Sequence, residues 1–218
     1  MQSNLPVYCE TWLYPPGAFP AEPINTATSF VPVILGVLAL LFLARRSDTG
    51  RIAYVLAVLL IFTGMGSVAW HALRTDVTLL VDALPGVAYF AVLIFFWVYY
   101  LGGRYFGVIP LAAIVLPMVF LRPAAPQTFW IVLLVVVVAC AAGLLAATWF
   151  RRRHAFKFAL AMVGFAAVAA ALRSIDLSVC ATIPFGTHFF WHIFLATAAY
   201  AGVRMMMVLR NGTVANGG

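Results

Sequence analysis

The chain has 218 residues, of which 65% are apolar and 9% are charged. A water-soluble globular domain has about 45–50% apolar and about 25% charged residues, so this chain would expose a very large apolar surface in water. The composition therefore predicts a membrane protein, and it excludes a soluble enzyme, a disordered tail and, with three cysteines, a disulfide scaffold. The net charge of +7 does not indicate nucleic-acid binding, because the basic residues lie in short turns between long apolar runs.

Seven apolar runs follow one another along the chain. The first 24 residues lack the basic and apolar regions of a cleavable signal peptide, so we expect the first run to insert and remain. A helix needs about 20 apolar residues to cross a bilayer core. The runs that meet this requirement cover residues 25–44, 52–73, 77–101, 105–121, 128–149, 155–174 and 184–209. The fourth run is the weakest, because Pro110 and Pro117 interrupt it.

These runs predict an all-α membrane protein, a seven-transmembrane-helix bundle. No internal repeat divides the chain into duplicated halves. We expect an extracytoplasmic N-terminal segment over residues 1–24, one catalytic transmembrane domain over 25–210 and a flexible cytoplasmic tail over 211–218. Asn25 is expected to cap the first helix.

The charges in the turns predict the orientation of the bundle. Lys and Arg side chains favour the cytoplasmic side of a membrane. One side has the ten residues Arg45, Arg46, Arg51, Arg104, Arg151, Arg152, Arg153, Lys157, Arg204 and Arg210, whereas the other has only Arg74, Arg122 and Arg173. We therefore expect the N-terminus outside and the C-terminus in the cytoplasm, in the inner membrane if the source is bacterial. All acids except Asp48 lie on the outer side.

Four ionisable side chains are predicted within the apolar helices, where such groups indicate a functional site. His71 lies near the end of the second run, Asp82 one to two turns into the third, and His188 and His192 in the first two turns of the seventh. The second helix runs outward and the other two run inward, so all four reach the same depth. Gly66 lets a neighbouring helix approach closely there.

The spacing of these residues indicates a metal site. His188 and His192 are four residues apart, which places both imidazoles on one helix face. A third imidazole from His71 completes the three-histidine set of catalytic zinc sites, whose fourth position is open for water. Asp82 either accepts a proton from that water or orients a ligand histidine. The hydroxyl of Ser67, four residues before His71, faces the same space.

Other functions are compatible with some of these features. The main alternative is a lipid receptor or lipid-binding protein with a structural zinc ion, although structural sites usually have four protein ligands. A proton or solute transporter would use the same groups as a relay, but no paired broken helices or inverted repeat indicate one. A retinal protein is excluded, because Lys157 is the only lysine and lies in a turn.

Several short motifs resemble those of a known family. YCE, AEPINT, GSVAWH with Asp82 eleven residues later, IDLSVC and HFFWH occur in this order from residue 8 to residue 192. In this order and spacing the chain resembles the alkaline ceramidases, which belong to a superfamily of seven-helix membrane hydrolases that includes the adiponectin receptors. The resemblance implies an intramembrane zinc amidase that cuts ceramide, or a related N-acyl membrane lipid, into a sphingoid base and a fatty acid.

The resemblance also implies a role for each site residue. His71, His188 and His192 match the zinc ligands, Asp82 matches the acid beside the zinc water, and Ser67 matches the serine that stabilises the oxyanion. The oligomeric state is left open.

A calcium site is the least well matched of the family's features. Glu10 and Glu22 match two acidic ligands, and Tyr8 matches a position that contributes a backbone carbonyl. Val7 and Trp12 stand where animal members carry an aspartate and an asparagine. Losing two oxygen ligands out of six to eight weakens calcium binding strongly. The alternative is that the two acids only cap the N-terminal segment.

The family also has a cysteine at each of two outer positions. The resemblance therefore implies a disulfide between Cys9 and Cys180, which would join the N-terminal segment to the loop between the last two helices. Two free thiols are the alternative. Cys140 lies in the middle of the fifth run and is expected to reach neither of them.

Overall fold

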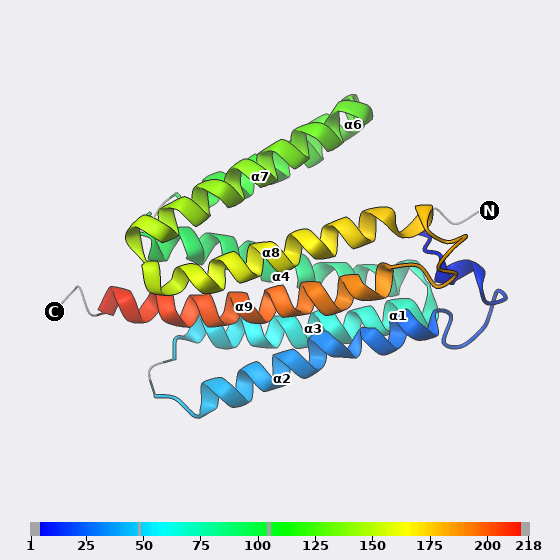
Figure 1. Ribbon diagram of the computed structural model, residues 1–218, viewed down its shortest axis with the longest axis horizontal. Coiled ribbons are helices and arrows are strands. Elements are labelled where there is room, and N and C mark those ends of the chain that lie inside the picture. Colours follow the sequence, from blue (N-terminus) through cyan, green and yellow to red (C-terminus); the bar gives the residue numbers. More distant parts are fainter. Residues whose placement is uncertain (1–4, 48, 104–105, 215–218) are drawn as a thin grey trace.

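Helices make up most of the computed structural model, which describes residues 5–47, 49–103 and 106–214 (Figure 1). No strand occurs in these ranges. The apolar runs form the helices α1 (Pro23–Thr28), α2 (Phe30–Ala44), α3 (Arg51–Leu73), α4 (Asp76–Tyr100), α5 (Val108–Leu116), α6 (Arg122–Ala124), α7 (Pro126–Arg151), α8 (Arg153–Ile175) and α9 (His188–Val214). Three short helical turns, η1 (Glu10–Trp12), η2 (Pro117–Leu121) and η3 (Asp176–Ser178), complete the set.

The seven predicted helices are confirmed. Six of them are long and apolar enough to cross a membrane, and α1 and α2 together make the first. The seventh, Val108–Ala124, is shorter and consists of α5, the π-helical turn η2 and α6. Proline lacks an amide hydrogen and clashes with the preceding turn, so the prolines in this segment prevent one regular helix. These helices indicate a multi-pass integral membrane protein.

Helix α9 occupies the centre of the bundle. Figure 1 shows α3, α4 and α8 running alongside it, whereas α7 leans away from α8 at the end that carries the N-terminal segment. Small residues let its neighbours approach closely: a Cβ atom at Gly202 would meet the hydroxyl of Tyr89, which donates a hydrogen bond of 2.6 Å to the carbonyl of Ala199. Much of α7, in contrast, has exposed apolar side chains, as expected of a helix that faces lipid.

The N-terminal segment packs across one end of the bundle. Its backbone is joined to the last turn of α3 by hydrogen bonds from Ala21 to Ala72 and from Glu22 to His71, each 3.0 Å. The predicted disulfide between Cys9 and Cys180 is present, with the two Cα atoms 5.2 Å apart. The segment is therefore attached both to α3 and to the loop before α9.

Two helix starts differ from the sequence-based expectation. Asn25 does not cap the first helix, because α1 begins at Pro23 and Glu22 occupies the N-cap position. Helix α9 begins at His188 rather than at residue 184, because the chain turns at Gly186, whose φ is 68°. At its other end α9 continues to Val214, which includes the first residues of the expected tail.

Thiol labelling tests the disulfide. In unreduced, denatured protein only Cys140 is expected to react, because the other two sulfur atoms are bonded to each other. After reduction all three cysteines should react, and the unfolding midpoint should fall, since this cross-link spans 171 residues and is worth about a few kcal/mol in the chain-entropy model. Three labelled cysteines without reduction would contradict the pairing.

Candidate metal centre

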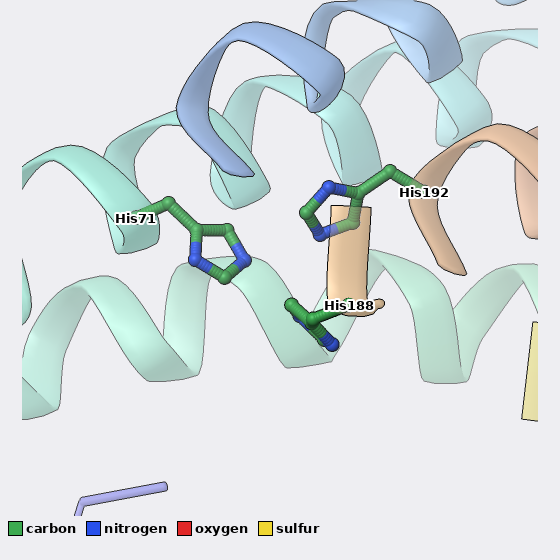
Figure 2. A group of neighbouring side chains, drawn as sticks. All are labelled: His71, His188 and His192. Atoms are coloured by element: carbon green, nitrogen blue, oxygen red, sulfur yellow. The ribbon is translucent and has the colours of Figure 1, made fainter. Parts of the chain in front are cut away.

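Three histidines from two helices meet at the end of the bundle that the N-terminal segment covers. His71 comes from the last turn of α3, and His188 and His192 from the first two turns of α9. The exposed fractions are 1% for His71 and His188 and 5% for His192. One ring nitrogen from each lies within 4.8 Å of the others, and Figure 2 shows the three rings turned toward a common space. The predicted convergence of these residues is therefore observed.

A buried carboxylate fixes the start of α9. Asp176 accepts hydrogen bonds from the backbone N–H groups of Thr187 (2.6 Å), His188 (2.8 Å) and Cys9 (3.1 Å). The first N–H groups of a helix have no partner within it and are stabilised by a negative charge. Asp176 therefore orients the first turn of α9, which carries His188, and connects it to the disulfide-bonded segment.

In two of the histidines, the ring nitrogen Nδ1 is hydrogen-bonded to a neighbouring oxygen. Nδ1 of His71 lies 2.5 Å from Oε2 of Glu22, which as a carboxylate can only accept the proton. Nδ1 of His192 lies 2.9 Å from Oγ1 of Thr28, whose own hydrogen is donated to the carbonyl of Ile24. Both histidines therefore carry a hydrogen on Nδ1, which leaves the lone pair on Nε2 for a metal ion.

His188 has a different environment. Its ring stacks on the ring of Tyr8, with centroids 3.8 Å apart, and Nη1 of Arg173 lies 3.1 Å from its Nδ1. The guanidinium of Arg173 also lies over Tyr8 and Trp191, at 5.4 Å and 5.2 Å from the ring centroids. The N-terminal segment thus contributes one aromatic wall of the site.

Asp82 and Ser67 lie beside the histidines. A Cβ atom at Gly66 would overlap the backbone of Val81 and Asp82, so α3 and α4 are in backbone contact at this point, as predicted. The contact brings the carboxylate of Asp82 next to Ser67 and within electrostatic range of His71. The hydroxyl of Ser67 is buried and lies 3.0 Å from that of Ser29. Ser29 in turn lies 3.5 Å from Nδ1 of His192, so Ser67 is connected to the cluster through this second hydroxyl.

The donor set fits a zinc ion. Three neutral imidazoles are a common catalytic zinc set, and bond lengths of 2.0–2.1 Å place tetrahedral ligand atoms about 3.3 Å apart. The separations of up to 4.8 Å between ring nitrogens are thus wider than in a metal complex by an amount that small side-chain rotations can close. In the described residues no other group of three His, Cys, Asp or Glu side chains comes together in this way.

The acidic residues of the N-terminal segment have protein partners. Burial raises the pKa of Glu10, although its carboxylate accepts N–H bonds from Ile24 (2.6 Å) and Asn25 (2.9 Å). Burial would also raise the pKa of Glu22, but hydrogen bonds from His71 and Thr11 and the charge of Arg74 keep it below its usual value.

The calcium site is therefore not supported. The carboxylate oxygens of Glu10 and Glu22 already interact with protein groups. The carbonyl of Tyr8, the third possible ligand, accepts the N–H of Thr11 at 3.1 Å. Glu22 instead orients His71.

The sequence analysis did not identify several residues of the site. Thr28, Ser29, Arg173 and Asp176 all contact the histidines or the backbone next to them. Asp176 lies within the motif IDLSVC, but no role was assigned to it from the sequence, because its partners lie 11 to 167 positions away. Thr28 and Ser29 gave no signal, because hydroxyl groups are common in membrane helices.

A comparison with protein families matches residues 6–216 to a family described as Ceramidase. The matched segment includes the whole histidine cluster and nearly all of the N-terminal segment that covers it. A search among curated proteins finds no match.

The metal content of histidine variants tests the centre. The purified protein is expected to bind about one zinc ion per chain, and His71→Ala or His188→Ala should lose most of it, because two imidazoles bind zinc poorly. His154→Ala is the matched control, since this exposed histidine lies in the first turn of α8. Full zinc content in both site variants, measured by elemental analysis, would refute the three-histidine assignment.

The Glu22 contact has its own test. Glu22→Gln removes the negative charge that makes His71 a stronger ligand, so zinc affinity should fall about 10- to 100-fold in a chelator competition. Glu10→Gln is the control, because this buried carboxylate contacts backbone rather than a histidine. An equal loss of affinity in the control would attribute the effect to packing of the N-terminal segment.

Proposed function

The chain belongs to the ceramidase family, and we propose that it is an intramembrane, zinc-dependent amidase. It hydrolyses ceramide or a related N-acyl lipid to a long-chain amine, a sphingoid base in the case of ceramide, and a free fatty acid. Membership of the family implies the hydrolysis of an amide. The observation that supports zinc dependence is the cluster of three buried histidines beside Asp82 and Ser67.

The histidines would hold the metal ion through Nε2 of His71 and His192 together with one nitrogen of His188. When bound, a zinc ion polarises the amide carbonyl and lowers the pKa of water to about 7. Glu22 and Thr28 keep the rings of His71 and His192 in the required tautomer. Preorientation of this kind lets the ion bind without reordering the buried side chains.

Asp82 is the proton carrier in this proposal. Its carboxylate accepts a proton from the attacking water and then gives it to the nitrogen of the leaving amine, so one group acts first as base and then as acid. The neighbouring Ser67 donates its hydroxyl hydrogen to the oxygen that becomes negative, an interaction worth about 2–4 kcal/mol when well aligned. The C–N bond breaks as the amine takes the proton, and the carboxylic acid is released.

The substrate reaches the site from the lipid. Asp82 is only half-buried, and its neighbours Leu80, Val81 and Leu84 are exposed on the surface of α4. An acyl chain can therefore lie along this apolar surface while the amide approaches Asp82. Because water is scarce there, the polar groups of the site interact with the substrate more strongly than they would in solution.

The orientation and domain structure are part of the proposal. The charge bias supports an orientation in which the histidine end is at the extracytoplasmic face and the opposite end is in the cytoplasm. The helices between residues 25 and 210 then form one catalytic domain, in the inner membrane if the source is bacterial.

Asp82→Asn tests the catalytic role. The variant should retain zinc but lose amidase activity by at least about 100-fold, because an amide cannot accept the proton. The assay is mass spectrometry of fatty acid and amine released from a panel of N-acyl lipids, with zinc content measured in parallel. Asp76→Asn is the matched control on the same helix, since Asp76 lies in the exposed first turn of α4.

Three outcomes would change the assignment. Full activity of Asp82→Asn would reduce this residue to a structural role. Loss of zinc would make it a metal ligand. If the unmodified protein with bound zinc hydrolysed no lipid of the panel, a lipid-binding protein with a structural zinc would be the better description.

A further inference from the structure

A groove lies at the end of the bundle opposite the histidines. Its volume is about 630 Å³, and it is lined by Leu38, Leu41, Phe42, Arg45, Arg46 and Tyr200. Tyr200 follows His192 on α9 by eight residues, which is about 12 Å along a helix axis. The groove is therefore separate from the candidate metal centre.

The groove is apolar at one end and cationic at the other. Leu38 and Leu41 are 48% and 52% exposed on α2, whereas Arg45 and Arg46 directly follow this helix. Seven residues separate Leu38 from Arg45, which is about 10 Å along the helix. An apolar strip thus leads to a pair of guanidinium groups where α2 ends.

A further arginine, Arg204, lies next to two residues that line the groove, Phe42 and Tyr200. The guanidinium of Arg204 is 4.0 Å from the ring centroid of Phe42, and that of Arg46 is 4.6 Å from the same ring. Arg204 lies within the membrane-spanning part of α9, and its Nε is buried without a hydrogen-bond partner. Its remaining described polar contact is a long one, 3.5 Å from Nη1 to the hydroxyl of Tyr200.

No described carboxylate neutralises these cations. In residues 5–47, 49–103 and 106–214 the only carboxylate that forms an ion pair is that of Glu22, at the other end of the bundle. Among the described residues, two guanidinium groups therefore share one aromatic ring without a carboxylate partner, and Asp48, the acid nearest to them in the sequence, lies outside the described residues. A charged side chain within a membrane segment is costly and normally serves a function, and an anion bound between these groups would lower their mutual repulsion.

We propose that this groove binds an anionic phospholipid. The phosphate is held by Arg45 and Arg46, with Arg204 adding positive charge next to Phe42, and an acyl chain lies along Leu38 and Leu41. The charge distribution favours an anionic over a zwitterionic headgroup, because the site contains three positive charges and no described negative one. The apolar strip favours a lipid over a free phosphate, because only a lipid buries it.

Lipid binding to the unmodified protein gives the first test. Protein purified in detergent is titrated with phosphatidylglycerol, phosphatidylcholine and glycerol 3-phosphate, and bound lipid is counted by native mass spectrometry. Phosphatidylglycerol should bind at least about tenfold more tightly than phosphatidylcholine, and glycerol 3-phosphate should not compete. Equal affinity for the two lipids, or full competition by glycerol 3-phosphate, would overturn the proposal.

A charge-matched pair of variants gives the second test. Arg45→Gln/Arg46→Gln should weaken phosphatidylglycerol binding about 10- to 30-fold, since each arginine near a membrane surface contributes about a factor of five to anionic-lipid affinity. The control Arg122→Gln/Arg153→Gln removes the same net charge from two exposed positions outside the groove. Equal losses in both variants would mean that only the net charge matters, and no loss in either would show that the groove is not the site. The lipid comparison above needs no variant, so the proposal stays testable if the double variant does not fold.

Discussion

The hydrogen bond between Glu22 and His71 is the interaction on which the organisation of the site depends. Both groups are buried, and their atoms lie 2.5 Å apart. In an apolar bundle a carboxylate must have partners within the protein, and removing one partner of such a buried pair costs about 3–5 kcal/mol. The second carboxylate oxygen of Glu22 interacts with Arg74 and Thr11, and the backbone N–H of Glu22 donates to the carbonyl of His71. One acid thus attaches the N-terminal segment to α3 and orients a histidine.

A second buried carboxylate, that of Asp176, attaches the N-terminal segment to α9 and orients the start of that helix. Asp176 bonds the first N–H groups of that helix and the N–H of Cys9, which is itself cross-linked to Cys180. The N-terminal segment is thereby fixed from two sides, and the ring of Tyr8 is held against His188. The segment that precedes the first helix is therefore part of the site, because it supplies the polar and aromatic partners that the helices lack.

The two ends of the bundle differ in how charge is balanced. At the histidine end, Glu22 is paired with His71 and Arg74, and Asp176 accepts backbone N–H groups, as burial of a carboxylate in an apolar medium requires. At the opposite end, Arg45, Arg46 and Arg204 are grouped around Phe42 and have no described carboxylate as partner. This asymmetry agrees with a chemical site at one end and a surface for charged lipid headgroups at the other.

The sequence by itself determined the helices and the identity of the central residues. Long apolar runs can satisfy their backbone groups in lipid only as helices, and the four-residue spacing of His188 and His192 places them on one face. Only the tertiary structure decided which partners orient them: Glu22 is 49 residues from His71, and Thr28 is 164 residues from His192. It also showed that Glu22, a possible calcium ligand by resemblance, contacts a histidine, and that Glu22 rather than Asn25 occupies the N-cap position of α1. These contacts depend on how the helices and the N-terminal segment pack, and a linear pattern of polarity contains no information on which distant polar groups will meet.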